Sequence, residues 1–269
     1  MANLIFKGQS LSDMGFIEGH YNDSSETEIQ LTGLTLNTIQ TKNNNVNYLV
    51  DIEDDTPLEK DFSVFKHPCE NAKYPSFTND EISEFQKWVL SDKYEELLIE
   101  DDYEVTFYRG MFTTVTALLN GSRSVIGYKI HFVCDGSYGF GIESVHTFSL
   151  TKGSSYTLEV DSDKYGEINP TKLVITCKES GTLNLYNSLT KKYMVISNCS
   201  KDEQITIDSK YCIITSNNIN HNEKIYNGFN FVFFRLYNTT KSSLNVISSS
   251  LNCDIEIRYK PIRRLGLIR

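Results

Sequence analysis

The sequence predicts a mainly β protein in two parts: an N-terminal β-barrel-like domain with one α-helix, and a C-terminal β-sandwich. Three observations support this fold class. Aromatic residues reach 12% of the 269 residues, mostly Tyr and Phe, which favour strands together with Thr, Ile and Val. Short apolar runs alternate with turn residues along most of the chain. Only one segment combines helical spacing with capping residues.

The first strands are expected before residue 67. Each candidate is short and bounded by Gly, Asn, Asp or Thr, as strands joined by turns are. The candidates are "NLIFKG", "MGFIEG", "TEIQLTGLTL", "NYLVDIE" and "FSVFK".

The single helix is predicted at about residues 78–91, within "SFTNDEISEFQKWVL". Thr78 suits the N-cap, and Glu81 three residues later completes a capping box. Phe85 and Trp88 fall on the apolar face, so we expect them to cover a sheet. Trp88 is the only tryptophan of the chain.

Strands resume after the helix with "EELLIE" and "YEVTFYRGMFTTVTALL", in which we expect a turn near Arg109 and Gly110. The long strand "RSVIGYKIHFVC" leads into the glycine-rich "DGSYGFG". The domain boundary is predicted there, giving domains 1–136 and 137–269.

The second half reads as many short strands without a capped helix, which is typical of a β-sandwich. No fixed-period repeat is evident. The predicted strands are "VHTFSL", "SYTLEVD", "KLVITCK", "GTLNLYN", "YMVIS", "QITIDS", "YCIITS", "FNFVFFRLYN", "SLNVISS" and "CDIEIRYKP".

The chain is acidic, with a net charge of −9, so nucleic acid is a poor candidate partner. Charge is unevenly distributed: residues 51–61 and 100–104 are acidic, and the C-terminal "RYKPIRRLGLIR" is basic. Complementary segments of this kind can guide assembly between copies. Solvated loops and a mobile tail are the simpler alternative.

No apolar run resembles a signal peptide or a membrane helix, so we expect a soluble protein made in a cytoplasm. Six scattered cysteines form no CxxC pair. Most lie within strand-like runs, which fits small buried thiols in a reducing compartment.

Motifs for catalysis, metals or cofactors are missing: the sequence contains no GxGxxG, GxxxxGK[ST], GxSxG or HExxH. We therefore predict no catalytic, metal-binding or cofactor-binding residues. The nearest thing to a metal or thiol motif, "HPCE" at 67–70, is weak. "DSDKYGEIN" at 161–169 has some calcium-ligand types but is better explained as a polar turn.

One arrangement extends over the whole chain. It begins with "IFKGQSLSDMGFIEG", continues through the capped helix to "WVLSDKYEELLIEDDYEVTFYRGMF", and closes on "FNFVFFRLYN…CDIEIRYKPI". In order and length this resembles the distal tail proteins of phages and prophages of Gram-positive bacteria.

The resemblance implies a structural virion protein whose second half is a galectin-like β-sandwich. Members of that family form a hexameric ring through their N-terminal domains, and the ring joins the tail tube to tip or baseplate proteins. The implied partners are further copies of the chain, the tail tube protein, the tape measure protein and the tail-tip or baseplate proteins. No catalytic residues are implied, and neither nucleic-acid recognition nor a membrane is expected.

Two alternatives stay open. A β-sandwich can bind host-surface glycans, although this half lacks a Trp and its His146 and His221 lie in no galectin-type His-Asn-Arg pattern, so galactoside binding is not expected. An enzyme such as a glycan hydrolase would require converging carboxylates or histidines.

If the chain forms a ring, each copy can cover the strand edges of its neighbour. We expect the acidic run 51–61 to meet the basic segment 258–264, including Arg263 and Arg264, across such contacts. The candidate structural or interface residues are Thr78, Glu81, Phe85, Trp88, Arg263 and Arg264.

Overall fold

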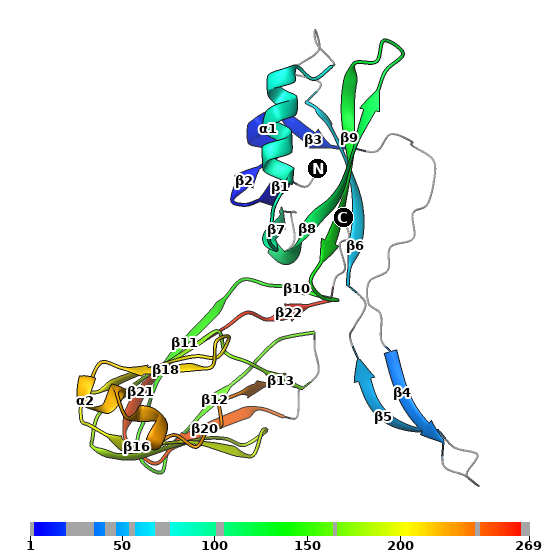
Figure 1. Ribbon diagram of the computed structural model, residues 1–269. Coiled ribbons are helices and arrows are strands. Elements are labelled where there is room, and N and C mark those ends of the chain that lie inside the picture. The colour runs from blue at the N-terminus through cyan, green and yellow to red at the C-terminus, as the bar shows by residue number, and fades with distance from the viewer. Residues whose placement is uncertain are drawn as a thin grey trace. The chain divides into compact units, whose positions relative to one another are not determined.

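A computed structural model describes residues 3–19, 35–40, 47–53, 57–67, 76–100, 105–163, 166–239 and 243–264. The protein is mainly β, as predicted (Figure 1). Its contacts divide it into an N-terminal unit, residues 1–141 with 263–269, and a C-terminal unit, residues 142–262.

The N-terminal unit is built on one curved antiparallel sheet, ordered β2-β1-β7-β8-β9-β6-β3. Strands β1 and β3 also come into contact, which gives the sheet the character of a half-barrel. A separate two-stranded sheet pairs β4 with β5. The strands of this unit are β1 (Asn3–Phe6), β2 (Gln9–Ser10), β3 (Phe16–Glu18), β4 (Thr35–Gln40), β5 (Asn47–Glu53), β6 (Glu59–Lys66), β7 (Glu95–Glu100), β8 (Val105–Leu119), β9 (Val125–Cys134) and β10 (Gly139–Phe140).

Helix α1 (Asn79–Val89) lies where the sequence predicts a helix, and a 3-10 turn, η1 (Ser12–Met14), precedes β3. The helix covers one face of the sheet (Figure 1). Strand side chains alternate between that covered face and the solvent, so one residue in two contributes to the core. The core is rich in aromatic rings, which pack mostly edge to face.

The C-terminal unit is a β-sandwich, as expected. Its sheets are ordered β11-β21-β14-β17-β18 and β12-β20-β15-β16, and one apolar core joins them. A third, two-stranded sheet pairs β13 with β19. The strands are β11 (Ser144–Leu150), β12 (Ser155–Leu158), β13 (Glu167–Ile168), β14 (Lys172–Cys177), β15 (Gly181–Asn187), β16 (Lys192–Cys199), β17 (Gln204–Asp208), β18 (Ile213–Ser216), β19 (Leu236–Tyr237), β20 (Asn245–Ser249) and β21 (Cys253–Tyr259). The last strand of the described chain, β22 (Ile262–Arg263), belongs to the sheet of the N-terminal unit, where it pairs with β10.

The predicted turn at Arg109 and Gly110 is wrong, because β8 runs through both residues. Gly110 pairs with Glu95 on one side and with Cys134 on the other. A Cβ at Gly110 would lie 2.7 Å from the Phe132 ring and 2.3 Å from a backbone oxygen of β9. The glycine therefore serves close packing inside a strand rather than a turn.

The predicted strand "FNFVFFRLYN" is also wrong over most of its length. Only β19 and an isolated bridge at Phe229 are extended pairings. Phe231 has a left-handed backbone (φ 56°), and the Asn230 side chain bonds the backbone of Tyr193, Val195 and Val232. The segment is thus an ordered loop. Two short helical turns, α2 (Ile219–Asn222) and η2 (Ile225–Asn227), lie in this half, and neither has a side-chain cap.

Candidate functional site

The N-terminus of α1 is fixed by the capping box that the sequence predicts. Thr78 has an extended backbone, and its Oγ1 accepts a hydrogen bond from the Glu81 amide at 3.3 Å. The Glu81 carboxylate accepts in return from the Thr78 amide at 2.6 Å. Glu81 also forms an ion pair of 2.7 Å with Lys66, a buried residue at the end of β6. The cap therefore also anchors the helix to the sheet.

The pKa of Glu81 reflects this environment. Burial raises this pKa. The hydrogen bonds from Lys66 and from the Thr78 amide and hydroxyl together lower it by more, so the pKa lies below its ordinary value. The ionised carboxylate is the form that stabilises the fold.

The apolar face of α1 belongs to the core. Phe85 is fully buried and stacks on Tyr128 with ring centroids 4.3 Å apart. Trp88 is 3% exposed and packs edge-on against Phe6 at 5.8 Å. Both side chains are therefore structural within one copy of the chain, and the helix offers a neighbour only its polar face.

Lys7 caps the other end of α1, which sequence reasoning missed. It lies in the tight β1–β2 turn with a left-handed backbone (φ 54°), and its Nζ donates to the carbonyl oxygens of Lys87 at 3.3 Å and of Leu90. A cation suits the carbonyl end of a helix. Some 80 residues separate the partners, so no local pattern could have revealed this contact.

The β4–β5 hairpin has the least-covered apolar surface of the described N-terminal unit. Ile39, Tyr48, Leu49 and Val50 are 52–59% exposed although all four lie in paired strands. The two strands pair only with each other among the described residues. An isolated two-stranded ribbon is marginally stable by itself, so these side chains favour a covering partner.

A charged cluster lies on the outer face of the sheet, opposite the core. Asp61 of β6 contacts Lys129 at 2.8 Å and His131 at 2.7 Å, both on β9. Glu59 lies 3.4 Å from the same imidazole. The hydrogen bond from Lys129, more than that from His131, lowers the pKa of Asp61 against the opposing effect of burial. Glu59, Asp61 and Ser63 fall two residues apart in "EKDFSVF", a polar spacing that indicates this outward face.

The two segments expected to meet across copies partly have partners in their own chain. Asp61, from the acidic run, is paired as above, and Arg258 bonds Glu256 at 2.6 Å. Arg263 ends β22 and Arg264 follows it, both half-buried. Residues 54–56 of the acidic run lie outside the described residues. Arg263 and Arg264 likewise interact within the chain, so the contact of the two segments across copies stays a prediction.

Other sequence candidates carry little chemistry. Within the described ranges, no group of three or more His, Cys, Asp or Glu side chains could hold a metal ion. His67 of "HPCE" is described, whereas residues 68–70 lie outside the described part. In the same part of the chain, no helix is long and apolar enough to span a membrane. The two histidines of the C-terminal unit lie apart in role: His146 stacks on Tyr259, and His221 bonds Glu203.

Two family models together account for nearly the whole chain. Residues 1–136 match the model described as a phage tail protein N-terminal domain, and residues 138–259 match a phage tail C-terminal domain. No curated protein sequence matches the chain.

Among solved structures, the fold is similar to that of the SPP1 Dit (gp 19.1) protein, described as a paradigm of the hub adsorption apparatus in Gram-positive infecting phages. The match has a TM-score of 0.65 and 12% identity, and it covers 97% of this chain and 99% of that one. A chain of the phage p2 baseplate, in its activated conformation with Sr, matches at a TM-score of 0.43 and 12% identity, covering 96% of this chain and 98% of that one.

Proposed function

This chain belongs to a family of phage tail proteins and is thus a virion component, and from that premise we propose that it is the distal tail hub. In this role several copies form a ring that joins the tail tube to the tip or baseplate proteins. The single observation that carries the proposal is the fold match to SPP1 Dit, a hub protein, along 97% of this chain. The match includes both units, so it is not a likeness of one common β-sandwich.

Uncovered apolar side chains support assembly between copies. Ile39, Tyr48, Leu49 and Val50 of the β4–β5 hairpin would be poorly placed in a permanent monomer. We propose that this hairpin packs on the neighbouring copy in the ring. Head-to-tail contacts of this kind close into a ring when the rotation between copies divides a full turn. We propose that six copies form the ring.

The proposed partners follow from the position of a hub. The tail tube protein and the tape measure protein would lie on one side of the ring, and the tip or baseplate proteins on the other. We propose a structural, non-enzymatic role. Two ion pairs of the described N-terminal unit serve its fold: Lys66–Glu81 anchors the helix, and Asp61–Lys129 joins two strands.

Synthesis in the host cytoplasm is part of the proposal. Cys134, Cys177, Cys199 and Cys253 are buried free thiols, which suits a reducing compartment. Burial, with a smaller contribution from Asp135, raises the pKa of Cys134 to about 12, so this thiol is protected from reaction at neutral pH.

Two measurements test the hub role. Light scattering on the purified chain should give a particle six times the 30.8 kDa mass of the chain, or that mass plus the bound tail tube protein when the latter is added. Immunogold electron microscopy of virions that carry the chain should label the distal end of the tail. Gold along the tail shaft or at the head-proximal end would contradict the hub assignment, whatever the oligomer measured in solution.

A further inference from the structure

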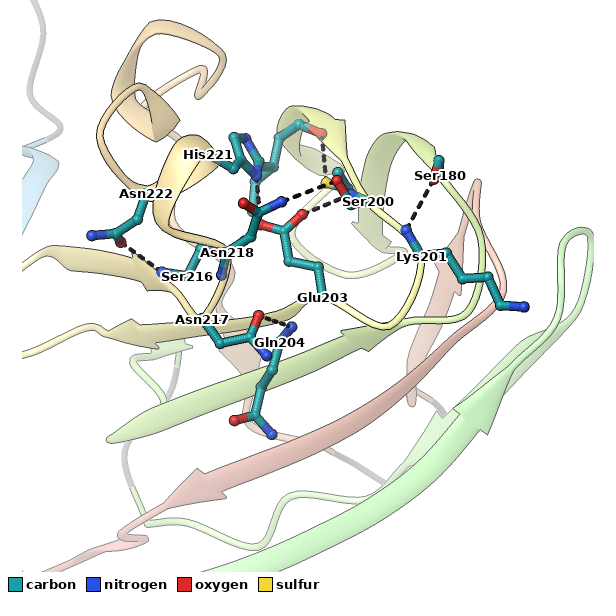
Figure 2. Close-up of polar contacts among 12 residues, drawn as sticks. Ser180, Ser200, Lys201, Glu203, Gln204, Ser216, Asn217, Asn218, His221 and Asn222 are labelled. Atoms are coloured by element: carbon teal, nitrogen blue, oxygen red, sulfur yellow. Dashed lines mark hydrogen bonds and ion pairs between the residues drawn. The ribbon is translucent and has the colours of Figure 1, made fainter.

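Glu203 is a buried carboxylate in the C-terminal unit, 2% exposed, just before β17. Its Oε2 accepts a hydrogen bond from the Ser200 amide at 2.7 Å. Its Oε1 accepts from the Ser216 hydroxyl and from Nδ1 of His221, the latter at 2.5 Å (Figure 2). Three donors thus compensate the burial of the charge.

This carboxylate fixes how His221 can act. An ionised carboxylate only accepts hydrogen bonds, so Nδ1 carries the proton of the imidazole. The second ring nitrogen, Nε2, is buried and has no hydrogen-bond partner among the described residues. His221 as a whole is 8% exposed. An unpaired buried nitrogen is costly, so a hydroxyl group or water that reaches Nε2 would lower the free energy.

His221 lines a cavity of about 550 Å³ beside α2. That volume is typical of small-molecule sites, which measure about 300–1,000 Å³. Apart from Gly228, the rest of the lining carries polar side chains: four amides, two hydroxyls and one ammonium group. These belong to Asn198, Asn218, Asn220, Asn227, Ser197, Ser200 and Lys224.

The frame of the cavity is ordered before any ligand arrives. The side-chain amide of Asn218 donates to the Ser200 hydroxyl at 3.2 Å, and its backbone amide donates to Ser216 at 3.0 Å. Asn198 has a left-handed backbone (φ 61°), which asparagine adopts more readily than most residues. Fixed polar groups of this kind lower the cost of ordering a site on binding.

We propose that this cavity binds a saccharide through its hydroxyl groups. A hydroxyl donates and accepts, so it can pair with Nε2 of His221 whether the imidazole is neutral or protonated, and with both ends of each Asn amide. An apolar ligand would leave these groups unpaired. The lining has no carboxylate or thiolate for a metal ion, and Lys224 is its only lysine or arginine. The inference goes beyond the hub role and does not depend on ring assembly.

The direct test uses the full chain with ¹⁵N-labelled histidine side chains. Only five histidines are present, so the Nε2 signal of His221 can be assigned by its loss in His221→Gln. The probes are glucose, galactose, N-acetylglucosamine and rhamnose at millimolar concentrations, with glycerol 3-phosphate and inorganic phosphate as anionic comparators. At least one sugar should shift Nε2 of His221 and leave the other histidines unchanged.

Variants in the lining decide between the outcomes. Asn220→Ala combined with Lys224→Ala changes two exposed lining residues and should weaken sugar binding at least about tenfold, the equivalent of one lost hydrogen bond. Glu223→Ala, an exposed residue of the same segment outside the lining, should bind as the unchanged chain does. The proposal is overturned if no sugar shifts His221, if the double variant binds equally well, or if only the anionic probes bind.

Discussion

The indole N–H of Trp88 donates a hydrogen bond to the backbone carbonyl oxygen of Gln9, 3.0 Å away. This contact ties the last turn of α1 to the β1–β2 hairpin. Lys7, from the same hairpin, donates to the carbonyl oxygens of Lys87 and Leu90 at the helix end. The first hairpin and the only long helix of the described chain are therefore joined by two side chains that reach in opposite directions.

The first prediction follows from this contact. Trp88→Ala removes a buried ring and its hydrogen bond and should lower the free energy of unfolding by about 3–5 kcal/mol. Trp88→Phe keeps most of the packing and should cost about 1–2 kcal/mol, chiefly for the Gln9 carbonyl oxygen left without its donor. Urea unfolding followed by circular dichroism measures both, because the substitutions remove the only tryptophan signal. A Trp88→Phe variant as stable as the unchanged chain would argue against a contribution of the hydrogen bond.

The second prediction concerns the capping box. Thr78→Ala removes the acceptor for the Glu81 amide and should destabilise the N-terminal unit by about 0.5–2 kcal/mol. Thr78→Ser keeps the hydroxyl and should stay close to the unchanged chain. Ser83→Ala is the matched control, because Ser83 lies on the exposed face of the same helix. A loss at Ser83 as large as that at Thr78 would indicate a general sensitivity of the helix and not a cap.

The third prediction is a pH dependence. The folded-state pKa of Glu81 lies below the ordinary value of 4.5, so its stabilisation is present above pH 4.5 and is lost as the pH falls through the folded-state pKa. Glu81→Gln leaves the buried Lys66 cation without its partner and should cost about 1–3 kcal/mol at pH 7. Urea midpoints of the two proteins should converge in acid. A difference that stays constant from pH 7 down to pH 3 would contradict this account.

The helix could be predicted from sequence because its signals are local. Thr78, Glu81 and the spacing of the apolar residues all lie within one short segment, and the structure forms α1 there. The β-rich character was equally visible, since strand periodicity needs only neighbouring residues. What α1 packs against depended on Phe6 and Tyr128, which are distant in sequence.

The errors arose where tertiary contacts override local preference. Gly110 indicates a turn by itself, yet it is a strand residue because the Phe132 ring occupies the space beside it. The aromatic run at 229–238 has strong strand propensity, but Asn230 side-chain bonds and the left-handed Phe231 hold it as a loop. The Glu203–His221 pair was missed because a histidine in a polar loop carries no local sign of a buried partner. The galectin-like detail of the sandwich stays a prediction.

The fourth prediction separates assembly from folding. Leu49→Asp and Val50→Asp place a charge on the exposed faces of the β4–β5 hairpin and should change the free energy of unfolding by no more than about 0.5 kcal/mol. If a neighbouring copy covers these side chains, the buried unpaired charge should weaken association by at least about 3 kcal/mol. Light scattering over a concentration series measures the association.

Ile219→Asp is the matched control for the hairpin, since Ile219 is equally apolar and more exposed but lies in the C-terminal unit. It should leave the oligomer unchanged. The hairpin is excluded as the interface if Leu49→Asp and Val50→Asp assemble as the unchanged chain does.

The fifth prediction addresses the basic segment. Arg263→Glu combined with Arg264→Glu reverses two charges at the end of β22. If these arginines meet the acidic run of a neighbour, the double reversal should slow ring formation and reduce its dependence on salt, because charged rims act chiefly on the rate of association. Stopped-flow light scattering at low and high salt measures both effects.

Lys152→Glu and Lys201→Glu, two exposed charges of the C-terminal unit, control for net charge. Assembly with unchanged rate and salt dependence would exclude the arginines from the contact and leave the hairpin as the surface to test.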